Sequence, residues 1–250
     1  GEEKIAQREP RNSIISALSS IVRQTKTRDA IVCLPADSVS FETATITKTS
    51  QENELSSIVF ALTEKLLFSH GQAVLFYEKI DSVNSKVVYR VVVSSSENVA
   101  FLRSVFENSG VNVLKFVSQA DALINSCVKK ENLLPTMVIN LESQNSIVGL
   151  AYPFEILPQI SRHLAKDKIS ELIEDVYVDF YKKYDEKLSY ILASGELAQD
   201  ENFLNYLSRQ TRLSIEQADA LINFENASGV PIITKDESLL YAVALGLAIS

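Results

Sequence analysis

Glycine is scarce in this chain of 250 residues, which contains only seven. Proteins average about 7% glycine, so loops that wrap closely around phosphate groups should be few.

Two cysteines, Cys33 and Cys127, lie in apolar stretches, and we expect free, buried thiols rather than a disulfide. Of the two histidines, His70 lies at a predicted helix end and His163 in a polar loop. Neither has other ligand types at metal-binding spacing, so no metal site is expected.

Long apolar runs are also missing, since none approaches the roughly 18 residues that cross a bilayer. The N-terminus, GEEKIAQREP, lacks the basic and then apolar layout of a signal peptide. The net charge of -8 is spread along the chain. This argues against nucleic-acid binding, which depends on clustered Lys and Arg. We therefore expect a cytoplasmic globular protein, whose 46% hydrophobic residues suffice for one large core or two smaller ones.

Residues 35–116 are predicted to form a compact α+β unit with the order strand, helix, strand, strand, helix, strand. Its first helix is the best marked in the chain, because Thr49 and Glu52 form a capping-box pattern and Gly71 lies just past the end. Ser96 is expected to cap the second helix and Gly110 to close it.

Apolar periodicity also predicts elements on both sides of this unit. They are a helix at 14–22, a strand at 30–34, a helix at 120–128, strands at 137–141 and 147–151, a helix at 169–180, a strand at 190–193, a helix at 203–207, a short strand near Ser214 and a last helix from about Ser238.

Four stretches resemble the PilM/FtsA group of actin-like proteins. The last twelve residues, LLYAVALGLAIS, are similar to the helix that closes that fold, where Gly246 and the alanines would allow close approach to a neighbouring backbone. Residues 189–207, SYILASGELAQDENFLNYL, resemble the strand, turn and helix that hold adenosine. Residues 136–152, TMVINLESQNSIVGLAY, resemble the second phosphate hairpin. Residues 87–116 are similar to the strand, helix, turn and strand of PilM-like proteins, so the resemblance runs from about Ile31 to the end.

The resemblance implies an α/β (mixed α+β) fold of the actin-like ATPase type, which is ribonuclease H-like and has two lobes. Residues 1–135 would form the first lobe, with the inserted α+β subdomain at about 35–116, and residues 136–250 the second. Members usually begin with a strand and glycine turn that form the first phosphate loop, and nothing before Ile14 looks like one. We therefore expect an incomplete first lobe, through trimming in cloning, of which Gly1 would be a remnant, or through loss.

The resemblance also implies a degenerate nucleotide site. Its positions are Asn140, Glu142, Ser143, Gln144, Gly195 and Glu196. The family's hairpin runs approximately V-D-I-G, so Asn140 replaces a carboxylate that could serve a magnesium shell, and Glu142 puts negative charge where a phosphate would lie. Gly195 keeps the first glycine of the adenosine turn, but Glu196 replaces another. We expect no catalytic residues, no ATP hydrolysis and no tightly bound cofactor.

For function, the resemblance implies a bacterial, non-catalytic scaffold of type IV pilus assembly or a similar membrane-associated system. It would bind the cytoplasmic tail of a bitopic inner-membrane protein in a groove beside the inserted unit, and so lie in the cytoplasm, peripheral to the inner membrane. Two alternatives stay open: an active actin-like ATPase, with ATP and magnesium bound, whose first loop was removed in cloning, and an FtsA-like protein that self-associates into filaments.

Overall fold

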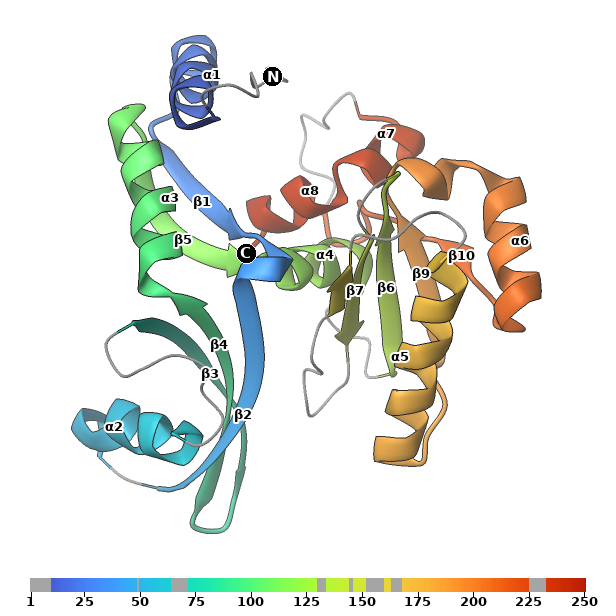
Figure 1. Cartoon of the computed structure of the whole chain (residues 1–250), viewed down its shortest axis with the longest axis horizontal. Helices are drawn as coiled ribbons and strands as arrows, with labels where there is room; N and C mark the ends of the chain where they lie inside the picture. The colour runs from blue at the N-terminus through green and yellow to red at the C-terminus, as the bar shows by residue number, and fades with distance from the viewer. Residues whose placement is uncertain are drawn as a thin grey trace.

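The computed structural model describes residues 10–48, 50–63, 72–129, 134–143, 146–151, 160–162, 168–224 and 233–250. Helices and strands are interspersed along these residues in a mixed α/β order (Figure 1). The elements are α1 (Pro10–Thr25), β1 (Asp29–Leu34), η1 (Ala36–Ser38), β2 (Val39–Thr47), α2 (Gln51–Leu62), β3 (Ala73–Val83), β4 (Lys86–Ser95), α3 (Ser96–Asn108), β5 (Asn112–Ser118), α4 (Gln119–Cys127), β6 (Thr136–Leu141), β7 (Ser146–Ala151), β8 (Ile160–Arg162), α5 (Ile169–Tyr184), β9 (Tyr190–Ser194), η3 (Glu196–Gln199), α6 (Glu201–Thr211), β10 (Glu216–Gln217), α7 (Lys235–Leu240) and α8 (Ala242–Ala248).

The described strands form three sheets. β1 and β5 pair in parallel, β2, β4 and β3 form an antiparallel sheet in that order, and a mixed sheet has the order β10-β9-β6-β7-β8. In Figure 1 the first two sheets lie on the left, the third lies on the right, and α4 and α8 lie between them. The predicted limits at 1–135, 35–116 and 136–250 stay a prediction, although β5 pairs with β1 and not with the three-stranded sheet.

We call β2, β3 and β4 the inserted sheet. One of its faces packs on α2, where Ile58 and Leu62 meet Ala44, Val91 and Val93 in a closed apolar cluster. Successive residues of a strand point to opposite faces, so Val92 lies on the other face, opposite Phe76 of β3. This second face packs on a different apolar cluster, which contains residues of β1, β5 and α3.

The five-stranded sheet has helices on both faces, which explains why every residue of β6 is buried. The odd-numbered Met137, Ile139 and Leu141 join the cluster that contains apolar residues of α5 and α6. The even-numbered Val138 joins a second cluster, with residues of α4 and α8. The alternation of the strand thus divides this core into two layers.

Three local predictions need correction. Ser95, and not Ser96, caps α3, because the Asn98 amide donates to the Ser95 hydroxyl at 3.1 Å. The last predicted helix is two helices, α7 and α8, which meet at Tyr241. The short strand predicted near Ser214 is β10, two residues later.

Other predictions are confirmed or lie outside the described residues. Gly110 closes α3 with a φ of 80°. Cys127 is buried and Cys33 half-buried, both are free, and burial raises the pKa of Cys33 to about 12 and that of Cys127 to about 11. The N-cap residue of α2 is Ser50, without a side-chain cap hydrogen bond, so the capping box predicted from Thr49 and Glu52 is a fourth correction. The predictions for His70, Gly71, His163 and Gln144 fall outside the described residues.

Candidate functional site

The closing helix α8 packs directly against α4. A Cβ atom placed on Gly246 would lie 1.6 Å from the carbonyl oxygen of Ala122. This confirms the predicted close approach, which only a residue without a side chain permits. The two helices are also joined where the Asn125 amide donates to the Ser250 hydroxyl at 2.9 Å.

Four of the predicted nucleotide-site residues converge at the ends of β6 and β9. Asn140 and Ser194 are paired in register, and the buried Ser194 hydroxyl donates to the Asn140 side-chain oxygen at 3.1 Å. The Asn140 side-chain amide in turn donates to Glu142 Oε1 at 3.1 Å. Gly195 and Glu196 follow directly after β9. Ser143 is exposed to solvent beside them.

The electrostatics of this site are acidic. Burial raises the pKa of the Glu142 carboxyl, the hydrogen bond from Asn140 lowers it, and the neighbouring Glu196 carboxylate raises it. The net pKa shift is upward. The Glu196 backbone also forms a hydrogen bond with the Glu142 carboxyl group, so two acidic residues lie close together where the resemblance would place a phosphate.

The backbone at Gly195 is fixed by contacts within the chain. Its N–H donates to the Leu239 carbonyl at 2.9 Å. Its φ is 91°, and a Cβ atom there would lie 2.5 Å from the carbonyl oxygen of Leu141. The glycine is therefore required by the tight turn itself, and its N–H already has an acceptor.

A second site lies on the face of the inserted sheet opposite α2. A groove of about 390 Å³ lies where this face meets β5 and α4. We call it the Arg90 groove. Its lining includes Phe76, Glu78, Arg90, Val92, Phe116 and Asp121. It lies beside the inserted unit, where the resemblance implies that a tail binds.

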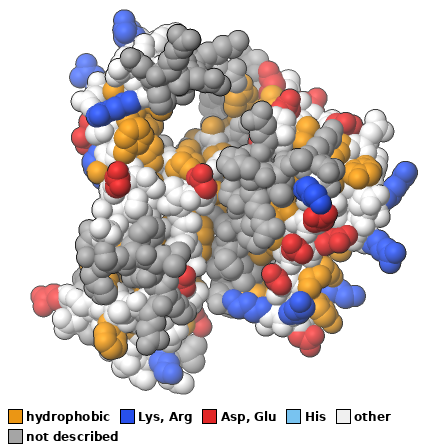
Figure 2. All heavy atoms as spheres, viewed as in Figure 1, with side chains coloured by type: hydrophobic (Ala, Val, Ile, Leu, Met, Phe, Trp, Pro, Cys, Tyr) orange, Lys and Arg blue, Asp and Glu red, His pale blue; other side chains and the backbone are white. Residues whose placement is uncertain are grey.

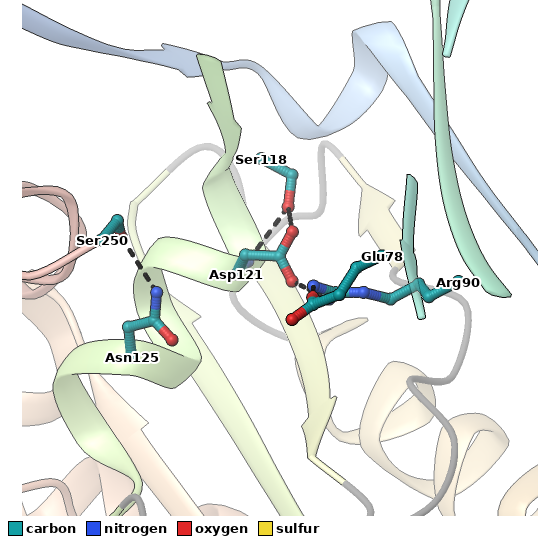
Figure 3. A network of polar contacts seen from close by, with 6 residues as sticks. All are labelled: Glu78, Arg90, Ser118, Asp121, Asn125 and Ser250. Atoms are coloured by element: carbon teal, nitrogen blue, oxygen red, sulfur yellow. Dashed lines mark hydrogen bonds and ion pairs between the residues drawn. The ribbon is translucent and has the colours of Figure 1, made fainter. Parts of the chain in front are cut away.

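Polar side chains meet at one side of this groove (Figure 3). Arg90 of β4 forms ion pairs with Asp121 of α4 and with Glu78 of β3, the latter at 2.8 Å. Ser118 caps α4: its hydroxyl accepts from the Asp121 N–H at 3.1 Å and donates to Asp121 Oδ2 at 2.6 Å. Arg90 and Asp121 are each only 14% exposed, whereas Glu78 is 67% exposed. The Arg90–Asp121 pair thus joins the inserted sheet to α4.

Sequence reasoning did not single out Arg90, Asp121 or Glu78. One signal was present, since Ser118 and Asp121 have the spacing of a helix cap. The turn between β3 and β4 does not by itself place Glu78 opposite Arg90, because the register shifts between Lys79 and Asp81.

Comparison with known proteins supports the fold. No protein-family model matches the sequence, and no curated protein is similar to it. A chain of the PilM-PilN type IV pilus biogenesis complex has a TM-score of 0.76 at 13% identity, over 100% of this chain and 87% of that one. The cytoplasmic domain of EpsL, an inner membrane component of the type II secretion system of Vibrio cholerae, has a TM-score of 0.55 at 13% identity, over 92% and 80% of the two chains.

A protein of Bacteroides thetaiotaomicron with an actin-like ATPase fold and unknown function matches with a TM-score of 0.42 at 11% identity, over 81% of this chain and 76% of that one. None of the helices within the described residues is long and apolar enough to cross a membrane. The predicted resemblance is thus confirmed at the level of the fold: this chain has a mixed α/β, actin-like fold similar to that of PilM.

Proposed function

We propose that this chain is a non-catalytic adaptor of a pilus or secretion assembly, and that it binds the cytoplasmic tail of an inner-membrane protein in the Arg90 groove. It would then act in the cytoplasm, held near the inner membrane by that partner. The observation that carries the proposal is the groove itself, since it combines apolar walls with a fixed polar cluster.

The walls of the groove suit an extended peptide. Phe76 and Val92 of the inserted sheet face Phe116 of β5, and the Phe76 and Phe116 rings lie 6.2 Å apart. At this centroid distance the two rings are in contact, so apolar side chains of a peptide would pack on top of them, along the groove. Within the described residues β5 pairs only with β1, so its other edge can offer main-chain hydrogen bonds to an added segment.

The residues at the predicted nucleotide site favour an adaptor without ATPase activity. Glu142 and Glu196 would repel a phosphate, since like charges about 4 Å apart cost roughly 1 kcal/mol even in water. Asn140 cannot replace a carboxylate beside magnesium, and the Gly195 N–H is bonded to Leu239. Among the described residues of the site, the Gly195 N–H is thus not free to bind a phosphate, and the two acidic side chains disfavour a triphosphate.

The structural neighbours point in the same direction. One belongs to a complex of PilM with PilN, and the other is the cytoplasmic domain of an inner membrane component of a secretion system. This chain covers most of both neighbours, which favours a similar role in a membrane-associated assembly.

Binding of synthetic tails tests the proposal. Fluorescein-labelled peptides would represent the cytoplasmic tails of the single-span inner-membrane proteins of the source organism, and fluorescence anisotropy would give each dissociation constant. We expect one tail to bind, and Phe76→Ala to weaken that binding about ten-fold or more, as the loss of a buried aromatic anchor does.

Phe101→Ala is the matched control, because Phe101 is an exposed phenylalanine of α3 that does not line the groove. Both variants should unfold cooperatively, which thermal unfolding would verify. Equal binding to wild type and Phe76→Ala, or no binding by any tail, would contradict the proposal.

A further inference from the structure

The charged side chains of the Arg90 groove differ in how firmly they are held. The groove is lined by two acidic residues, Glu78 and Asp121, and two basic ones, Arg90 and Lys115. Asp121 is 14% exposed, is paired with Arg90 and also accepts from Ser118. Breaking a pair as buried as Arg90–Asp121 would leave an uncompensated charge. These two residues are therefore part of the framework and are not available to a ligand.

Glu78 is in a different situation. It lies on β3 directly opposite Arg90, and its Oε2 contacts Arg90 Nη2 at 2.8 Å. Its side chain is 67% exposed, and it shares a single guanidinium charge with Asp121. One positive charge facing two carboxylates leaves a net negative charge at this end of the groove. Of the two carboxylates, that of Glu78 is the one exposed to solvent. A second cation can approach this carboxylate without displacing Arg90.

Lys115 supplies the opposite charge from β5. Its side chain is exposed, and no ion pair joins it to another residue of the described segments. The groove thus offers an exposed carboxylate on the β3 wall and an exposed ammonium on the β5 wall. Which of them meets the ligand decides the charge that the ligand must carry.

Given the proposed function, on which this inference rests, we propose that the bound tail carries a basic side chain that pairs with the carboxylate of Glu78, next to an apolar side chain that packs on Phe76. Cytoplasmic segments near membrane spans are rich in Lys and Arg. The chain itself has a net charge of -8, and on the face shown in Figure 2 its basic side chains are dispersed. The carboxylate of Glu78 and the negative net charge of the chain thus both favour the binding of a basic peptide.

A double-mutant cycle tests the pairing. The probes are the tail peptide that binds in the anisotropy assay and the same peptide with its Lys or Arg residues replaced one at a time by Gln. We expect Glu78→Gln to weaken binding of the wild-type peptide about two- to five-fold, as the loss of an exposed charge pair does. One Gln peptide should bind the wild-type chain about as weakly, and combining it with Glu78→Gln should add no further loss.

Two readouts separate this pairing from a structural effect. Raising the salt concentration from about 50 to 300 mM should weaken wild-type binding more than Glu78→Gln binding, because screening acts on the charge pair. The matched control Glu107→Gln removes the same charge from an exposed site on α3, outside the groove, and should change the affinity less than two-fold.

The outcomes distinguish this inference from the function on which it rests. If Phe76→Ala weakens binding but Glu78→Gln does not, the groove binds the tail and the pairing with Glu78 is wrong. If Glu78→Gln strengthens binding and Lys115→Gln weakens it, the ligand is acidic at this point, which also overturns the inference. If no tail binds the wild-type chain, the proposed function fails first, and the inference fails with it.

Discussion

The contact between α4 and α8 leads to a quantitative prediction for Gly246→Ala. The added Cβ atom would lie 1.6 Å from the Ala122 carbonyl oxygen, whereas a carbon and a carbonyl oxygen in close contact are about 3.3 Å apart. The helices would have to separate by roughly 1.7 Å, because the clashing atom belongs to the backbone and cannot rotate away. Such overpacking costs about 3 kcal/mol, and alanine returns about 1 kcal/mol in helix propensity.

We therefore expect Gly246→Ala to lower the free energy of unfolding by about 2 kcal/mol or more, which in a chain of this size corresponds to a decrease in Tm of about 4 to 8 °C. Thermal unfolding followed by circular dichroism would measure it. Gly149→Ala is the control, because its new Cβ atom would meet the flexible Ile124 side chain, at 3.3 Å. A Tm for Gly246→Ala at or above that of wild type would mean that helix propensity dominates and that the close packing of α4 and α8 is wrong.

Three further predictions concern the two sites. Millimolar Mg·ATP should leave Tm unchanged, because we expect no ATP binding. A ligand present at 100 times its Kd would stabilise the folded state by about 2.7 kcal/mol, so a clear upward shift of Tm would restore the ATPase alternative. Glu142→Gln keeps the acceptor for Asn140 and removes a carboxylate whose pKa is raised in the folded state. A carboxyl group of this kind favours folding when the pH is below its pKa in the unfolded chain, near 4.5, and this contribution is lost as the pH rises through its pKa in the folded state. The Tm of the variant should therefore exceed that of wild type at pH 7 and equal it at pH 4. Equal Tm values at pH 7 would contradict this prediction. Asp121→Asn should cost about 2 to 4 kcal/mol in urea unfolding because it leaves the buried Arg90 with only Glu78; a cost below about 1 kcal/mol would mean that this pair does not join the inserted sheet to α4.

Most of the helices and strands could be predicted from the sequence, because each depends on residues close together in the chain. The small residues of the last segment indicated a helix that packs closely, and Gly246 does so. Short-range signals also produced the errors. Ser95 and Ser96 are equally good cap residues, and only the geometry selects the first. Nothing in the periodicity of 238–250 marks the break at Tyr241.

The Arg90 groove could not be predicted in the same way. Arg90 and Asp121 are 31 residues apart and lie on different elements, so their contact depends on how the inserted sheet is placed against α4. That placement is a tertiary property that composition and spacing do not encode locally. The convergence of the residues predicted as a nucleotide site was easier to predict, because the ends of adjacent parallel strands meet at one edge of a sheet, which brings Asn140 beside Ser194.

The position of α4 has a mechanical consequence. Its first turn holds Asp121, its next residue meets Gly246 of α8, and Asn125 holds the Ser250 hydroxyl. A pulling force applied to the Arg90 groove would therefore be carried by α4 and its packed partner, and not only by the thin strand connections of the inserted sheet. Because α4 and α8 are packed together, both helices would carry this force. The backbone contact between Gly246 and Ala122 lies where the tension would pass from α4 to α8.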